Sequence, residues 1–167
     1  MDSKIKPIRR SKQLAPLSRE HHDGLLFVWK LRQGLHNNTA IEILSSFCIW
    51  YWKQHIKSHF QQEETILLQY MDADHKMAIQ LKREHNDIRE LILSINHHPD
   101  RITIGILADF IDRHIRFEER ILFKHLEKTL SQEQLDAIFQ QLEAQPICSG
   151  IWEDAFWVKD DQLSNRN

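Results

Sequence analysis

The sequence predicts an all-α fold, an antiparallel up-and-down bundle of four long helices followed by a short fifth helix and a tail. From Leu17 onward, apolar residues recur at spacings of three and four, as they do on one face of a helix. The segments between these periodic stretches are short, which favours antiparallel neighbours. The 167 residues include only four glycines and four prolines, too few for the many turns of a β fold.

Capping signals place the helices in order along the chain. Ser18 is a good N-cap for the first helix, and Thr39 with Glu42 has the spacing of a capping box for the second. A turn around Pro99 separates the third helix from the fourth, and Ser131 begins a capped fifth helix. The expected bounds are 18–34, 39–70, 72–95, 101–127 and 131–143.

The chain is predicted to form one domain with an appendage at each end. Residues 1–16 are basic and polar, and we expect a flexible arm there. Residues 17–143 form the bundle with its short fifth helix. Residues 144–167 form an aromatic tail that is too apolar to be free in solvent. We expect this tail to pack on the bundle, with an interface to a second copy as the alternative.

Composition excludes several classes of protein. Lys and Arg total 22 against 24 Asp and Glu, a net charge of −2, which argues against a nucleic-acid binder. No apolar stretch predicts a signal peptide or a membrane-spanning helix. Two cysteines are too few for a disulfide framework, so a cytoplasmic location is expected. Histidine, by contrast, is unusually frequent, with 11 residues.

Two predicted helices carry the same local motif. His59 and Glu63 belong to the second helix, and His114 and Glu118 to the fourth; both segments read His-x-x-x-Glu-Glu-x-Ile-Leu. Residues four apart on a helix project to almost the same side, so each helix can offer an imidazole and a carboxylate together. Both motifs lie on the core-facing stripe. Because buried carboxylates are paired or coordinate metal ions, two such motifs predict a cation.

The glutamates that follow each motif are expected to face solvent. Glu64 and Glu119 lie about 100° further round their helices than the preceding glutamates. We therefore predict a solvated, salt-bridging face for them. His55, one turn before His59, either lines an access route or is an ordinary polar residue.

The first and third helices are each expected to add one histidine. On the third helix, His85 shares a face with Leu81 and Ile88. On the first helix the choice lies between His22, which aligns with His85 through the pattern His-x-x-aliphatic, and His21, which aligns through the pair Glu-His. We prefer His22, because that alignment also brings Leu25 and Trp29 onto its stripe, and His21 remains the alternative.

Four imidazoles and two carboxylates suit a pair of metal ions bridged by the carboxylates. Carboxylate ligands favour iron, with manganese or zinc as substitutes. Six protein ligands leave room for a bridging oxo or hydroxo group and for an external ligand. The predicted ligands are His22 (or His21), His59, Glu63, His85, His114 and Glu118.

This ligand set, together with Leu-Ser-Arg-Glu-His-His at 17–22, resembles the hemerythrin-like, or HHE cation-binding, family over about residues 17–126. The resemblance implies a four-helix bundle that holds a non-haem di-iron centre. Members of the family carry oxygen, sense oxygen or iron, or repair iron–sulfur clusters after nitrosative or oxidative damage.

The sequence departs from the oxygen carriers at two positions. Leu81 stands one turn before His85, where the carriers have a second histidine, and Glu118 follows His114 by four residues instead of five. Both departures point to the repair type, whose ligands are four histidines and two glutamates. Repair proteins generally carry a cysteine-containing N-terminal segment, and residues 1–16 contain no cysteine.

We therefore expect a cytoplasmic di-iron protein, monomeric or homodimeric, that handles iron or binds or reacts with oxygen, nitric oxide or peroxide. The expected setting is a stress response or iron–sulfur cluster repair. The alternative is an iron- or oxygen-dependent sensor or adaptor whose bundle is read by a protein partner. No nucleic-acid or membrane partner is expected.

Overall fold

Residues 10–146 and 150–158 are described by the computed structural model, and every regular element within these two ranges is helical. The predicted all-α class is therefore confirmed. Expectations for residues 1–9, for 147–149 with Cys148, and for 159–167 fall outside the described residues. None of the described helices is both long and apolar enough to cross a bilayer.

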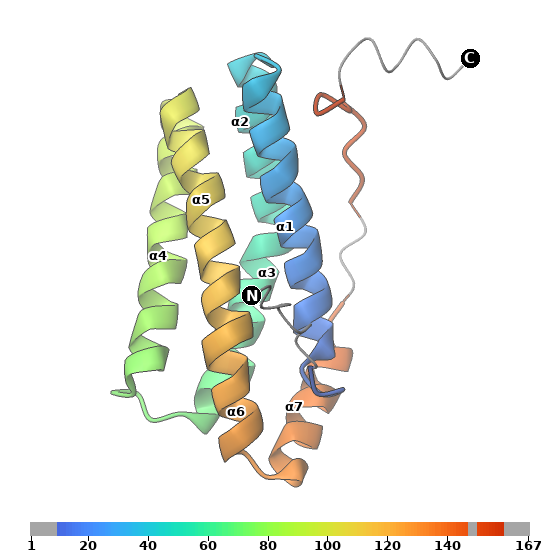
Figure 1. Cartoon of the computed structure of the whole chain (residues 1–167), viewed down its shortest axis with the longest axis vertical. Helices are drawn as coiled ribbons and strands as arrows, with labels where there is room; N and C mark the ends of the chain where they lie inside the picture. Colours follow the sequence, from blue (N-terminus) through green and yellow to red (C-terminus); the bar gives the residue numbers. More distant parts are fainter. Residues whose placement is uncertain (1–9, 147–149, 159–167) are drawn as a thin grey trace, which may run out of the picture.

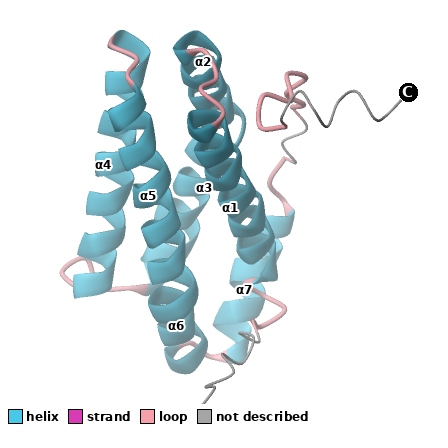
Figure 2. Ribbon diagram, turned by 45° about the horizontal axis from the view of Figure 1, so that its top comes forward, coloured by secondary structure: helices cyan, strands magenta, loops and turns pink. Residues whose placement is uncertain are grey.

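Long helical segments lie side by side (Figures 1 and 2). Two of them are continuous helices built from several pieces, because short π-helical turns interrupt the α-helical pattern. In order, the elements are α1 (Ala15–His36); α2 (Ile41–Tyr51), η1 (Trp52–Ile56), α3 (Lys57–Gln62), η2 (Glu63–Leu67) and η3 (Leu68–Tyr70); α4 (Lys76–His97); α5 (Arg101–Phe117), η4 (Glu118–Leu122) and α6 (Phe123–Thr129); and α7 (Gln132–Glu143).

Helix ends agree with the sequence where the cap is local. Ser131 caps α7 through a capping box with Gln134, and Asp100 caps α5 by accepting a hydrogen bond from the Thr103 amide. The expected caps of the first two helices are wrong. The first helix begins three residues before Ser18, whose hydroxyl instead donates to Glu119, and the N-cap of α2 makes no side-chain hydrogen bond.

The apolar core consists of two clusters with a polar layer between them. The first cluster contains Ile88 of α4 and Ile111 of α5. The second cluster contains Leu81 of α4 and Phe117 of α5. Between the two clusters lie the buried His85 on α4 and the buried His114 on α5. The buried histidines and glutamates of the described residues therefore gather at one level of the helices.

Residues 150–158 lie along the side of the molecule beside α1 (Figure 1). Phe156 is 9% exposed and packs edge-on against Phe47 of α2 with ring centroids 5.0 Å apart. Gly34 makes this contact close, because a Cβ atom there would lie 2.7 Å from the Phe156 ring. The Lys30 ammonium stands 4.0 Å over the Trp157 ring, a cation–π contact.

Candidate metal centre

The buried polar layer contains one histidine from each of four helical segments and two glutamates. His21 comes from α1, His59 from α3, His85 from α4 and His114 from α5, while Glu63 and Glu118 are the first residues of η2 and η4. Both glutamates are fully buried. π-Helical turns are often found at functional sites. Here η2 and η4 each begin at a buried carboxylate that follows a histidine by four residues, whereas η1 begins at Trp52.

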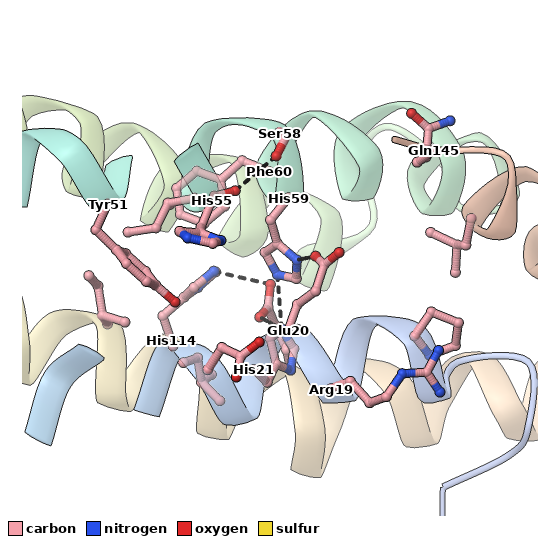
Figure 3. Close-up of a pocket in the computed structure, with 18 of the residues that line it drawn as sticks. Arg19, Glu20, His21, Tyr51, His55, Ser58, His59, Phe60, His114 and Gln145 are labelled. Carbon is pink, nitrogen blue, oxygen red and sulfur yellow. Dashed lines mark hydrogen bonds and ion pairs between the residues drawn. The ribbon is translucent and has the colours of Figure 1, made fainter. Parts of the chain in front are cut away.

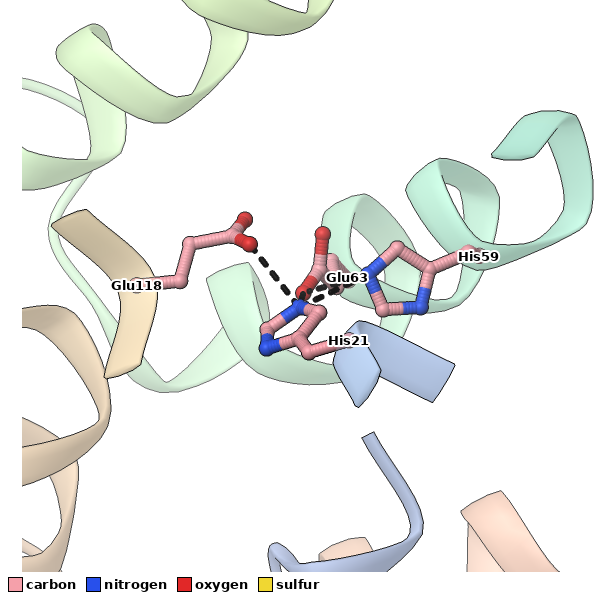
Figure 4. A group of neighbouring side chains, drawn as sticks. All are labelled: His21, His59, Glu63 and Glu118. Carbon is pink, nitrogen blue, oxygen red and sulfur yellow. Dashed lines mark hydrogen bonds and ion pairs between the residues drawn. The ribbon is translucent and has the colours of Figure 1, made fainter. Parts of the chain in front are cut away.

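The six residues form two overlapping groups that share both glutamates. Figure 4 shows the first group, and in each group one ligand atom per residue lies within 4.8 Å of the others. The groups are His21, His59, Glu63 and Glu118, and Glu63, His85, His114 and Glu118.

The two oxygens of each glutamate face different histidine pairs. In Glu63, Oε1 lies 3.2 Å from Nε2 of His59 and Oε2 lies 3.2 Å from Nε2 of His85. In Glu118, Oε2 lies 2.9 Å from Nε2 of His21 and Oε1 lies 3.1 Å from Nε2 of His114. Each carboxylate thus contacts both pairs of histidines.

Many of these buried atoms lack a hydrogen-bond partner within the described residues. They include both carboxylate oxygens of Glu63 and of Glu118 and the Nε2 atoms of His85 and His114. Leaving buried polar atoms unpaired is costly. In addition, Nε2 of His21 and Nε2 of His59 are only 3.0 Å apart, so at most one of them can carry a proton. The donor set therefore fits metal cations, which these residues could hold.

In each of the four histidines of the cluster, the second ring nitrogen, Nδ1, is hydrogen-bonded to a carboxylate. An Nδ1–H held in this way leaves the Nε2 lone pair directed at the centre, as in metal-bound histidines with an outer carboxylate. The four Nδ1–carboxylate pairs are His21–Glu119 at 2.7 Å, His59–Glu20 at 2.6 Å, His85–Glu64 at 2.7 Å and His114–Glu84 at 2.7 Å.

The four outer carboxylates were not predicted from the sequence, and the predicted solvent-facing position of Glu64 and Glu119 is wrong. Their side chains reach across to histidines of neighbouring helices. The repeated pair Glu20-His21 and Glu84-His85, which also gave the alternative alignment through His21, contains the signal for two of them. A preceding glutamate in each pair bonds the histidine of the next helical segment.

Arginines hold two of the outer carboxylates in place. Arg89 donates to Glu64 at 2.7 Å, and Arg10 donates to Glu119 at 2.6 Å. The Arg10 side chain is only 7% exposed and also bonds Glu127. Residue 10, expected within a flexible arm, thus contacts the outer layer of the site.

Mutual contacts shift the pKa values of the buried groups in opposite directions. Burial alone lowers the pKa of His85, but the nearby carboxylates of Glu118, Glu63 and Glu64 raise it to about 10. His59 behaves alike: burial lowers its pKa, and Glu63 with Glu20 raises it to about 9. Burial raises the pKa of Glu118, yet the charges of His114 and His21 hold it well below its usual value.

The structure separates the two candidates on the first helix. His21 is 3% exposed and lies in the cluster, on the same buried stripe as Leu17 and Val28, whereas His22 is exposed. The preference for His22 is therefore corrected to His21. It rested on Leu25 and Trp29, which are 38% and 48% exposed and so mark an outer apolar face.

A cavity of about 410 Å³ opens onto one side of the cluster (Figure 3). It reaches His21, His59, His114 and Glu118 at its inner end, and His55 lines it. The Phe60 ring, which also lines the cavity, stacks on His85 with centroids 3.7 Å apart. Cys48 lies in the apolar core, and burial raises the pKa of its thiol to about 12.

Comparison with known proteins gives one match. A family model described as the hemerythrin HHE cation binding domain matches residues 12–126. No curated protein and no solved structure matches the chain.

Proposed function

Because the chain belongs to the hemerythrin HHE cation-binding family, we propose that it is a non-haem di-iron protein that binds or reacts with a small molecule or handles iron. The observation that carries the proposal is the arrangement of Glu63 and Glu118, each of which turns one unpaired oxygen toward His21 and His59 and the other toward His85 and His114. The proposed ligands are His21, His59, Glu63, His85, His114 and Glu118.

Iron is favoured because carboxylates together with imidazoles suit it, and manganese or zinc can occupy the same donors. Bound iron would supply the coordination and redox chemistry of oxygen, nitric oxide or peroxide. The chain's own contribution is to orient the histidines through their Nδ1 bonds and to admit the small molecule through the cavity. The pattern of four histidines and two glutamates supports the iron–sulfur-cluster repair type within the family.

The remaining parts of the proposal concern the whole molecule. We infer the antiparallel up-and-down four-helix arrangement for 17–143, supported by the short connections between long helical segments. The division into an N-terminal arm, a bundle and a C-terminal tail, a cytoplasmic location and a monomeric or homodimeric state belong to the proposal as well.

Metal analysis after iron supplementation tests the centre. We expect about two iron atoms per chain, as the two overlapping groups would hold. His21→Ala should lose metal, whereas its neighbour His22→Ala serves as the matched control and should keep it. Iron content near zero in the unmodified protein, or equal content in the two variants, would contradict the assignment.

The small-molecule role needs its own measurement. Anaerobic iron loading followed by optical titration with oxygen and with nitric oxide should give stoichiometric spectral changes. An iron-loaded protein whose spectrum changes with neither molecule would refute a reactive centre.

One observation favours the alternative function of a sensor or adaptor. Leu25, Leu26 and Trp29 of α1 are 38%, 44% and 48% exposed, an apolar surface suited to a protein partner. If a partner protein or a second copy of the chain binds this surface, Trp29→Glu should abolish association in sedimentation experiments without changing the iron content. Unchanged association would remove the support for this alternative.

A further inference from the structure

The cavity beside the candidate metal centre is larger than a diatomic ligand requires. Its volume is about 410 Å³, while one water molecule occupies about 30 Å³ of liquid. Pockets that bind small organic molecules fall between about 300 and 1,000 Å³. Size alone therefore places this cavity in the range of an organic ligand.

Its walls combine an apolar body with one well-placed hydroxyl. Ile56, Phe60, Ile111 and Ile115 line the cavity and are all buried. Tyr51 is 8% exposed, and its hydroxyl points into the cavity (Figure 3). The Tyr51 ring is held between neighbours, stacked on Phe27 with centroids 4.0 Å apart. This residue can donate a hydrogen bond to an oxygen of a bound molecule.

The protonation states of Tyr51 and His55, which line the cavity, favour the binding of neutral ligands. Burial raises the pKa of the Tyr51 hydroxyl, so this group stays protonated and remains a donor at neutral pH. Burial also lowers the pKa of His55, which faces the same cavity, so its ring is uncharged there. The described wall groups between the entrance and the cluster thus offer no cation to an anionic ligand.

The entrance carries mainly negative charge. Glu20, Asp23 and Glu143 contribute carboxylates to the described lining, and Arg19 contributes a guanidinium that lies 3.8 Å from Glu143. Carboxylates at a rim repel an anion and tolerate a neutral molecule. The charge of the entrance therefore argues against organic acids and phosphates.

We propose that this cavity binds a neutral organic molecule of the phenol or alcohol class, with its apolar body against Ile111 and Ile115 and its oxygen between the Tyr51 hydroxyl and the His/Glu cluster. The inference rests on the proposed function only in that the oxygen meets the candidate metal centre. It names the substrate class that this centre would act on beyond a diatomic molecule. The apolar walls and the Tyr51 hydroxyl belong to the chain itself.

Calorimetric titration with 4-ethylphenol tests the proposal, using Zn²⁺-loaded protein because zinc does not change oxidation state. For a ligand of about nine heavy atoms we expect a Kd of about 0.1–1 mM. The anion 4-ethylbenzoate, similar in size, should bind at least about tenfold more weakly. Equal or tighter binding of 4-ethylbenzoate, or no binding of 4-ethylphenol, would overturn the proposal.

Two variants localise the binding. Tyr51→Phe removes only the hydroxyl and should weaken 4-ethylphenol binding by about threefold to tenfold. Ile111→Phe fills the cavity and should abolish binding, whereas Ile106→Phe adds the same bulk to an exposed position of α5 and should leave it unchanged. Unchanged binding in Tyr51→Phe refutes the proposed contact even if Ile111→Phe fails to fold.

The metal content of each sample separates this inference from the proposed function. Protein that takes up no metal but binds 4-ethylphenol would refute the metal centre and leave the cavity assignment standing. Metal-loaded protein that binds no 4-ethylphenol would refute the cavity assignment alone.

Discussion

Loading metal into this protein should release protons, because its site histidines are protonated in the metal-free state. The pKa of His85 is raised to about 10, and the pKa values of His21 and His114 are raised as well. Nε2 of His21 and Nε2 of His59 are 3.0 Å apart and can hold one proton between them. One proton shared by His21 and His59 and one on His85 amount to about two protons per chain at pH 7, and the raised pKa of His114 adds to this release.

A release of this size makes metal affinity steeply dependent on pH. The overall association constant should fall about tenfold per released proton, and so about a hundredfold or more, for each unit of pH lowered below 7. The number of protons can be measured by anaerobic titration of ferrous ion into metal-free protein, with calorimetry in two buffers of different ionisation enthalpy. Protons lost by coordinated water would add to the count.

Variants identify the source of the protons. His85→Ala should reduce the release by about one proton, whereas His22→Ala, which alters an exposed ring outside the cluster, should leave it unchanged. A release below one proton in the unmodified protein, or an affinity that does not change between pH 6.5 and about 8, would refute the reasoning.

Three further outcomes are expected. The pKa of His85 is raised to about 10, so its protonation stabilises the metal-free fold below about pH 6.5. This stabilisation is lost as the pH rises through 10, and the melting temperature of metal-free protein should therefore fall between these two pH values. A melting temperature that rises over this range would contradict the prediction. Glu119→Gln removes the negative charge that is hydrogen-bonded to Nδ1 of His21, and it should lower metal affinity about tenfold to hundredfold in equilibrium dialysis. The control Glu143→Gln, at an exposed position, should not change the affinity. Equal effects of the two variants would show that Glu119 does not support His21 as a ligand. Phe156→Ala should lower the free energy of unfolding, measured in urea, by about 3 kcal/mol. The control Ile151→Ala, at a residue that is 85% exposed, should cause almost no change. A similarly small change in both variants would mean that residues 150–158 do not pack on the helices.

The parts of the site that could be predicted from sequence are those within one helix. His59 with Glu63 and His114 with Glu118 share a helical face at a spacing of four, and the spacing alone identifies that face. The all-α class follows from periodicity in the same way. A single helix contains the needed information in each case.

Contacts between helices could not be predicted in this way. The pairing of Glu64 with His85 depends on how two helices are rotated relative to each other, which periodicity does not specify. Apolar stripes also misled the choice of His22, because Leu25 and Trp29 are apolar yet exposed. The cavity likewise arises from the gap between packed elements, so no single segment predicts it.

The hydrogen bond between His21 and Glu119 joins residues 98 positions apart, and this separation affects how the protein can be made. Contacts between distant residues form late, because the intervening chain must first be brought together. On a ribosome, the first helix emerges long before its carboxylate partner, so His21 is not held in its tautomer until most of the chain has been translated. If the proposed centre holds metal, we expect uptake only after residue 119 has been translated, and a nascent chain stalled before that residue should not retain metal.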